Sequence, residues 1–309
     1  MKYKKMPGHI ALLFSNIIFG FNTPISRSLM PEILSPFALT FFRLSGGMIL
    51  FWLVSLFVKT EKVPAKDIFL LFFASFFSLT FNQLPYFIGL SMTSSINASI
   101  VVTLLPILTM LLAALFLKEP ITLLKAIGVL VGASGALLLV LNGPISSGKG
   151  NIWGDFIVIL GVTSFAIYLT LFKNLISRYS PVTVMKWMFL FATFVSFPFC
   201  YSSLIHINFA ILSPGIYWRI SYMVVFATFV GYLLIPIGQK LLRPTTLSMY
   251  NYIQPIVTSI VAVFIGIDTF GYEQALSGIL VFSGVYIVTQ SKSKAQLEAE
   301  KTSKSQKAI

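Results

Sequence analysis

The sequence predicts an all-α integral membrane protein of ten transmembrane helices, built as two inverted five-helix repeats around a central cavity. Composition is the first reason: the 309 residues are 57% hydrophobic and 10% charged, whereas soluble domains carry about 25% charged residues. The second is that ten apolar stretches are each long enough to cross a ~30 Å hydrocarbon core as a helix. The third is a repeat of the first half in the second half.

The ten predicted spans follow one another with short polar breaks. The break between the first two carries Pro31 and Pro36. Uniformly apolar runs such as LLFFASFFSLTF, from Leu70, lack the period-2 alternation of barrel strands and so favour helices. The spans cover residues 9–28, 36–58, 67–91, 95–117, 121–141, 152–173, 181–203, 214–239, 245–266 and 270–290.

The two ends of the chain frame these spans. The start, MKYKKMPGHIALLF, has the basic and apolar regions of a signal peptide, but its apolar run is of spanning length and no A-x-A site follows. We therefore expect a retained first span. Residues 291–309 are polar and lysine-rich, which predicts a disordered, basic cytoplasmic tail.

The lysines and arginines that give the net charge of +13 are unevenly distributed between the two sides of the membrane. With the N-terminus cytoplasmic, seventeen of the 22 lysines and arginines fall on the cytoplasmic side and three fall outside. Lysine and arginine in short loops set orientation in this way. The charge therefore predicts cytoplasmic N- and C-termini and does not indicate binding to nucleic acid. The single cysteine, Cys200, excludes an intrachain disulfide.

The repeat is clearest where PILTMLLAALFLKEP, from Pro106, matches PIVTSIVAVFIGIDT, from Pro255, 149 residues later. Without a gap, Gly89 then aligns with Gly238 and Gly135 with Gly284. Each half holds five spans, and an odd number makes the second half start on the opposite side of the membrane. We therefore predict a first repeat over residues 1–145 and an inverted second repeat over 146–290, the arrangement typical of secondary transporters.

The stretch YFIGLSMTSSINASIVVTLLPILTMLLAALFLKEPITLLKAIGVLVGASGALLL resembles the EamA domain of the drug/metabolite transporter superfamily. NIIFGFNTPISR and PFALTFFRLSGG are similar to that family's first two spans, and the resemblance covers residues 8–290. It implies ten helices in two inverted units, with a central cavity lined by spans 1–4 and 6–9. The chain departs from the family pattern at Asp268, where the second-half glutamate is expected, and at Phe19, where a tryptophan is frequent.

Polar side chains inside predicted spans are the candidates for contact with a solute, because such residues usually face the bundle interior or a water-filled path. At 100° per residue, several of them share one helix face. The alternative is that they hydrogen-bond neighbouring helices, at about 1 kcal/mol per bond. The predicted cavity-lining residues are Asn16, Asn22, Arg43, Asn82, Gln83, Tyr86, Tyr250, Asn251 and Gln254.

Arg43 is the one arginine of this set, about 10 Å into the membrane at helical rise from Pro36. A buried guanidinium can hold a carboxylate or a phosphate with two parallel hydrogen bonds. It can equally extend its head to the interface or bond backbone carbonyls. The sequence leaves these alternatives open.

Four prolines inside predicted spans, Pro85, Pro106, Pro236 and Pro255, are the candidate gating residues. Each removes a backbone hydrogen bond in a helix interior and tends to kink the helix. They fall in spans 3–4 and 8–9, and we expect their kinks to shape the gates.

No aspartate, glutamate or histidine lies at mid-membrane. The sequence therefore offers no evident acid–base pair, proton relay or metal cluster, and it has no Walker motif, so it predicts no enzyme, no metal and no cofactor. Coupling to protons stays undecided, and facilitated or exchange transport remains open. We expect a secondary transporter of a small organic metabolite in a bacterial cytoplasmic (inner) membrane, working by alternating access. The family resemblance implies efflux of an amino-acid-like or drug-like solute.

Two other functions remain alternatives: a lipid or lipid-linked sugar translocase, and a non-transporting membrane scaffold or sensor. The expected partners are a small-molecule solute and the lipid bilayer, and not nucleic acid. The sequence does not decide between a monomer and a homodimer.

Overall fold

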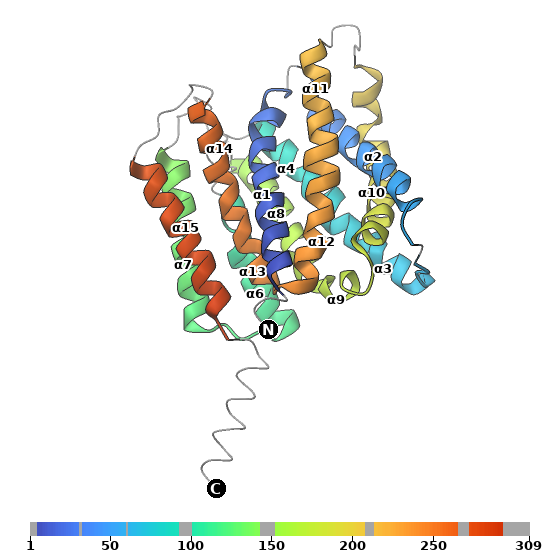
Figure 1. Ribbon diagram of the computed structural model, residues 1–309. Coiled ribbons are helices and arrows are strands. Elements are labelled where there is room, and N and C mark those ends of the chain that lie inside the picture. The colour runs from blue at the N-terminus through green and yellow to red at the C-terminus, as the bar shows by residue number, and fades with distance from the viewer. Residues whose placement is uncertain are drawn as a thin grey trace.

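The computed structural model describes residues 5–30, 33–59, 61–92, 101–142, 152–207, 213–264 and 272–292. Within these ranges the chain forms helices and no strand. The tail after residue 292, the start of the fourth predicted span and the junction between the ninth and tenth lie outside the described residues. The helices, drawn in Figure 1, are α1 (Met6–Arg27), α2 (Pro36–Ser55), α3 (Ala65–Ser75), η2 (Phe76–Thr80), α4 (Phe81–Met92), α6 (Leu105–Leu117), α7 (Leu123–Asn142), α8 (Ile152–Leu171), α9 (Lys173–Ile176), α10 (Pro181–Ile205), α11 (Pro214–Tyr222), η4 (Met223–Val230), α12 (Gly231–Leu241), α13 (Pro244–Met249), η5 (Tyr250–Tyr252), α14 (Ile253–Phe264) and α15 (Tyr272–Gln290).

Six helical stretches of the described chain are long and apolar enough to cross a membrane: Met6–Ser26, Pro36–Ser55, Ala65–Met92, Ile152–Leu171, Pro181–Ile205 and Pro214–Leu241. Large apolar side chains, including Leu115, Trp218 and Phe282, point outward from the bundle. An apolar surface of this extent is typical of contact with lipid. The prediction of an all-helical, membrane-embedded chain is therefore confirmed at this level.

Serine and proline define where two of the long helices begin. The Oγ of Ser35 accepts from the N–H of Ala38 at 3.1 Å, and Pro36 opens α2. Ser180 caps α10 in the same way, accepting from the N–H of Thr183 at 3.2 Å, and Pro181 follows it. Proline suits the first helical position because its missing N–H would have no partner there. Both starts agree with the predicted span boundaries.

Short π-helical segments interrupt the third and eighth predicted spans, which the sequence did not predict. η2 lies between α3 and α4, and η4 lies between α11 and α12. Serines of other helices bond backbone carbonyls beside these segments: Ser164 Oγ donates to Phe77 O at 2.7 Å, and Ser15 Oγ donates to Gly231 O at 3.0 Å. Isolated π-turns of this kind occur mostly within α-helices and often at functional sites.

The helices pack in pairs that correspond between the two halves of the chain. α4 packs against α8, and α12 packs against α1. α6 also contacts α8, and α14 also contacts α1. α2 packs against α10, and α7 lies along α15 as a pair at one side of the bundle (Figure 1). When each helix is replaced by its counterpart 149 residues away in the other half, every one of these pairs becomes a pair of the same set. For example, α4–α8 becomes α12–α1.

Glycines allow the closest of these approaches. A Cβ at Gly89 would lie 2.6 Å from the carbonyl oxygen of Gly154 on α8. A Cβ at Gly238 would lie 2.5 Å from the side chain of Leu12 on α1. Any larger residue at Gly89 would push the backbones of α4 and α8 apart, so this position specifies the distance between them.

We expect Gly284→Leu to separate α15 from α7. A Cβ at Gly284 would meet the backbone N of Gly132 at 2.5 Å and the O of Gly128 at 2.6 Å. Overpacking of this kind costs about 1–3 kcal/mol, so thermal unfolding of the purified protein should occur several degrees lower. Gly278→Leu on the same helix is the control, since nothing lies within 4 Å of its Cβ position. Equal losses for both variants would contradict the proposed close contact.

Candidate functional site

A cavity of about 130 Å³ lies inside the bundle, between helices of the two halves. Its lining comes from the later half of α1, the first half of α2, α4, the start of α6, α8, α12 and the η5–α14 region. The lining residues are Phe19, Asn22, Thr23, Ser26, Arg43, Asn82, Gln83, Tyr86, Phe87, Leu90, Val102, Leu105, Val162, Phe165, Tyr232, Ile235, Asn251 and Gln254. They include Asn22, Arg43, Asn82, Gln83, Tyr86, Asn251 and Gln254 from the predicted set.

Two predicted residues, Asn16 and Tyr250, are not part of this lining. Asn16 is buried behind it: Nδ2 donates to Leu12 O at 2.8 Å, and Oδ1 accepts from Gln254 Nε2 at 2.8 Å. Tyr250 turns away, and its hydroxyl lies 2.7 Å from Nδ1 of His9 near the start of α1. The face assignment assumed an unbroken α-helix, but Tyr250 begins a 3₁₀ turn, whose different period moves the side chain off that face.

Arg43 places a positive charge in the cavity wall. Its side chain is 5% exposed, Nε donates to Thr228 Oγ1 at 3.1 Å, and the guanidinium carbon lies 5.5 Å from the centre of the Phe87 ring. These contacts direct the head into the bundle instead of outward to the interface. Among the described residues the ion pairs are Lys125–Glu119 and Arg178–Asp67, so no described carboxylate pairs with Arg43.

The amide side chains of the lining divide into two groups. Asn82 Nδ2 donates to Gly161 O at 3.0 Å, so this amide joins α4 to α8. This is the interhelical hydrogen bond that the sequence offered as the alternative to contact with a solute. Gln83 Nε2 donates to Tyr232 Oη at 3.0 Å, but Gln83 Oε1 is buried without a described partner, as is Asn22 Oδ1. Buried acceptors are rarely left unpaired. Neither oxygen is exposed to the cavity space, so each can accept from a bound molecule only after its amide group reorients.

Apolar and aromatic side chains complete the lining, and sequence reasoning missed them. Phe19, Phe87, Phe165 and Tyr232 supply rings, and the rings of Phe19 and Tyr232 meet edge to face at 5.6 Å. A phenylalanine that faces a cavity cannot be told from one that faces lipid by composition. The partner of Arg43, Thr228, was also missed, because it lies in the π-helical segment η4.

The four candidate prolines occupy two kinds of position. Pro85 and Pro236 lie inside α4 and α12, as predicted. Pro106 and Pro255 lie in the first turn of α6 and α14, which begin at Leu105 and Ile253. The N–H groups of a first turn have no partner within the helix, so Pro106 removes no hydrogen bond from α6. Pro255 differs, because α13, η5 and α14 follow one another without a break and Pro255 lies within this continuous helical run, just after the 3₁₀ turn. The expectation of an interior kink is corrected for Pro106, which follows a turn at residues 103–104, whereas for Pro255 it stays a prediction.

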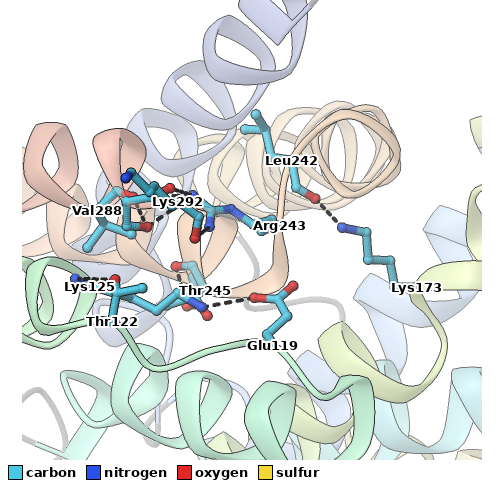
Figure 2. Close-up of polar contacts among 11 residues, drawn as sticks. Glu119, Thr122, Lys125, Lys173, Leu242, Arg243, Thr245, Val288 and Lys292 are labelled. Atoms are coloured by element: carbon cyan, nitrogen blue, oxygen red, sulfur yellow. Dashed lines mark hydrogen bonds and ion pairs between the residues drawn. The ribbon is translucent and has the colours of Figure 1, made fainter. Parts of the chain in front are cut away.

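Polar contacts tie the bundle together at the end where α1 begins and α15 finishes, which we call the inner end (Figure 2). Lys125 Nζ lies 3.0 Å from Glu119 Oε2, and the Lys125 side chain is only 1% exposed. Lys173 Nζ donates to Leu242 O at 2.6 Å, and Arg243 Nη2 donates to Ser291 O at 2.8 Å. We call Glu119, Lys125, Lys173 and Arg243 the inner cluster.

The inner cluster joins the α6–α7 turn, α9, the α12–α13 link and the end of α15. Burial lowers the pKa of Arg243, and the charge of Glu119 opposes that shift. The cavity lies away from the inner end, because α1 runs away from that end and its later half lines the cavity, together with α4 along most of its length. The molecule is thus held by charged contacts at one end and hollow toward the other.

Comparison with known proteins gives a consistent result. The model of the EamA-like transporter family matches residues 6–141 and 152–290. An uncharacterized transporter of Archaeoglobus fulgidus is 26% identical over 259 residues, covering 84% of this chain and 90% of the relative. A WAT1-related protein of Arabidopsis thaliana is 22% identical over 323 residues, covering 93% and 92%.

A protein of known crystal structure has the same fold. It aligns with a TM-score of 0.76 at 17% identity, over 94% of this chain and 97% of that one. At this identity the likeness concerns the fold alone. The family match spans nearly all of the described helices, and the relatives from Archaeoglobus and Bacillus are named transporters. The chain is therefore a multi-pass membrane protein with a transporter role, and it belongs to the EamA-like transporter family.

Proposed function

We propose that this protein is a secondary transporter, without ATP hydrolysis, that carries a small amino-acid-like or drug-like metabolite out of the cell by alternating access. The observation that carries this proposal is the cavity inside the bundle, which is lined from both halves of the chain and whose mainly apolar wall carries several polar side chains. Buried polar groups are costly in a membrane protein and usually mark the path of a solute. A volume of about 130 Å³ suits part or all of a small organic molecule.

The proposed architecture is two inverted five-helix units, residues 1–145 and 146–290, in a bacterial inner membrane with both termini cytoplasmic. The packing supports it, since α4–α8 corresponds to α12–α1 and α6–α8 to α14–α1. The π-helical segments also correspond, as do Ser15 and Ser164, which are 149 residues apart and bond carbonyls beside η4 and η2. Two near-equivalent halves have two near-equal arrangements, one open to each side.

In this proposal the hairpins formed by spans 3–4 and 8–9 move to gate the cavity. Pro85 and Pro236 lie in the helices that follow η2 and η4, so each hairpin carries a π-turn and a proline close together. Both features weaken the backbone hydrogen-bond ladder and allow bending. The inner cluster holds the inner end closed, and we infer that the conformation described is the one closed toward the cytoplasm.

We expect Pro85→Ala and Pro236→Ala to slow solute flux severalfold while leaving the folded yield nearly unchanged, because alanine restores a straight, stiffer helix. Flux into proteoliposomes and monodispersity in size-exclusion chromatography measure the two quantities. Pro106→Ala is the matched control in a first helical turn and should change flux less. A parallel loss of flux and yield in Pro85→Ala would mean that the proline serves folding alone.

The experiment that tests the proposed function is flux of a panel of labelled metabolites into proteoliposomes of the purified protein, against empty liposomes. Saturable flux of at least one small solute is the expected result. Scrambling of labelled lipids without solute flux would favour a lipid or lipid-linked sugar translocase instead. Absence of both activities would favour a membrane scaffold or sensor.

A further inference from the structure

We propose that the cavity selects its solute by charge: the Arg43 guanidinium binds a carboxylate of a small solute, and molecules carrying only a positive charge are rejected. This inference rests on the proposed function, in which the cavity is the solute site. It adds the chemical class of the solute and identifies Arg43 as the side chain that selects this class.

The first step is that Arg43 keeps its charge and lacks a counter-charge. A guanidinium does not lose its proton in proteins. Nε is occupied by Thr228 Oγ1, but neither Nη1 nor Nη2 hydrogen-bonds a described residue. A buried charge without a partner is strongly destabilising. A solute carboxylate would accept from both Nη groups or from one of them and so supply the missing partner.

The second step concerns the rest of the lining, which holds no aspartate, glutamate, lysine or second arginine. The cavity therefore carries one positive charge and no negative charge on its described walls. In such a low-dielectric space, a solute with only an amine would be repelled by Arg43 and would find no counter-ion. A phosphate dianion would bring two negative charges to a single cation, so a monoanionic carboxylate matches the wall better.

The third step is the pair of unpartnered acceptors, Asn22 Oδ1 and Gln83 Oε1. Both residues are buried and line the same cavity as Arg43. Once either amide reorients toward the cavity, its neutral oxygen can accept from an ammonium or hydroxyl group of a solute whose carboxylate is on Arg43. The rings of Phe19 and Phe165 face the remaining space and suit an apolar part. A zwitterion with an apolar side chain uses all three features.

The test is binding of charge-sorted ligands to the purified full-length protein by calorimetry. The panel holds matched sets of four to nine carbons, each a carboxylate, an α-amino acid, an amine and an alcohol; 3-phenylpropionate, phenylalanine, 2-phenylethylamine and 2-phenylethanol form one such set. Carboxylates or amino acids should bind, and their matched amines should not. Binding of amines alone, or of no carboxylate-bearing member, would overturn the proposal.

Variants of lining residues test whether the charge selection arises from the cavity wall. Arg43→Gln should weaken carboxylate binding by about thirtyfold or more. Gln83→Glu adds a negative charge to the same wall, and should weaken carboxylates and admit the matched amine. The Gln83→Glu variant keeps the test valid if Arg43→Gln does not fold. Arg219→Gln is the control, because Arg219 lies outside the lining and bonds Ser28 Oγ at 3.2 Å. An equal effect from Arg219→Gln would count against the proposal.

Flux separates the two proposals. If carboxylates bind in an Arg43-dependent way but no solute crosses proteoliposomes, the charge selection stands and the transport function fails. If amines are transported and carboxylates neither bind nor cross, the transport function stands and the charge selection fails.

Discussion

Glu119→Gln is expected to lower the free energy of unfolding by about 3 kcal/mol, near the low end of the range for breaking a buried ion pair. Glu119 is 14% exposed and Lys125 is 1% exposed. The substitution leaves the ammonium of Lys125 buried without its carboxylate. It also removes the negative charge that faces Arg243. Thermal unfolding of the purified protein should shift down by about 6–12 °C.

Two controls separate this effect from a general loss. Arg178→Gln breaks the other described ion pair, at 3.3 Å from Asp67, but Arg178 is 60% exposed and such pairs contribute about 0–1 kcal/mol. Combining Glu119→Gln with Lys125→Met removes both charges of the pair and should recover part of the stability, since Arg243 still lacks the negative charge of Glu119. If Glu119→Gln and Arg178→Gln shifted unfolding equally, the inner cluster would not have the stabilising role given to it here.

Phe51→Ala is expected to destabilise the protein by about 3–5 kcal/mol, the usual cost of a phenylalanine-to-alanine cavity. Phe51 is fully buried, and its ring lies 5.2 Å from the ring of Phe189 and 4.7 Å from that of Phe229. It therefore joins α2 to α10 and η4. The cost includes the packing contacts that the ring loses and the cavity that it leaves.

The matched control for Phe51→Ala is Phe57→Ala, six residues along the chain, where the side chain is 87% exposed. Thermal unfolding of the two variants in the same detergent measures the difference. We expect almost no shift for Phe57→Ala. Comparable shifts would mean that Phe51 is not part of the packed contact between the halves.

The sequence predicted the helical class and several helix starts because the physical signals for these are local. Apolar runs of spanning length reflect the bilayer, and Ser-Pro pairs begin α2 and α10. Polar residues in apolar runs identified much of the cavity wall for the same reason. Asn22, Gln83 and Gln254 stand out because their placement in a span would otherwise carry a free-energy cost.

What sequence reasoning missed depends on contacts between distant residues. The π-helical turns at η2 and η4 have no local sequence signal, and they determine which side chains, such as Thr228, meet Arg43. Tyr250 was misplaced because a 3₁₀ turn changed the helical period there. In the sequence, Glu119 cannot be distinguished from an ordinary acidic residue at the end of a helix. Only the folded chain places Arg243 beside it.

We propose that two halves of opposite orientation meet around a shared cavity. The most direct test of this proposal is the side of the membrane on which the link between the halves lies. Single cysteines placed at residues 143–150 and in the C-terminal tail of a Cys200→Ala background can be labelled with a membrane-impermeant maleimide in intact cells. We expect labelling at 143–150 and protection of the tail until the cells are opened. Protection of both positions in intact cells would contradict it, because the two halves would then enter the membrane from the same side.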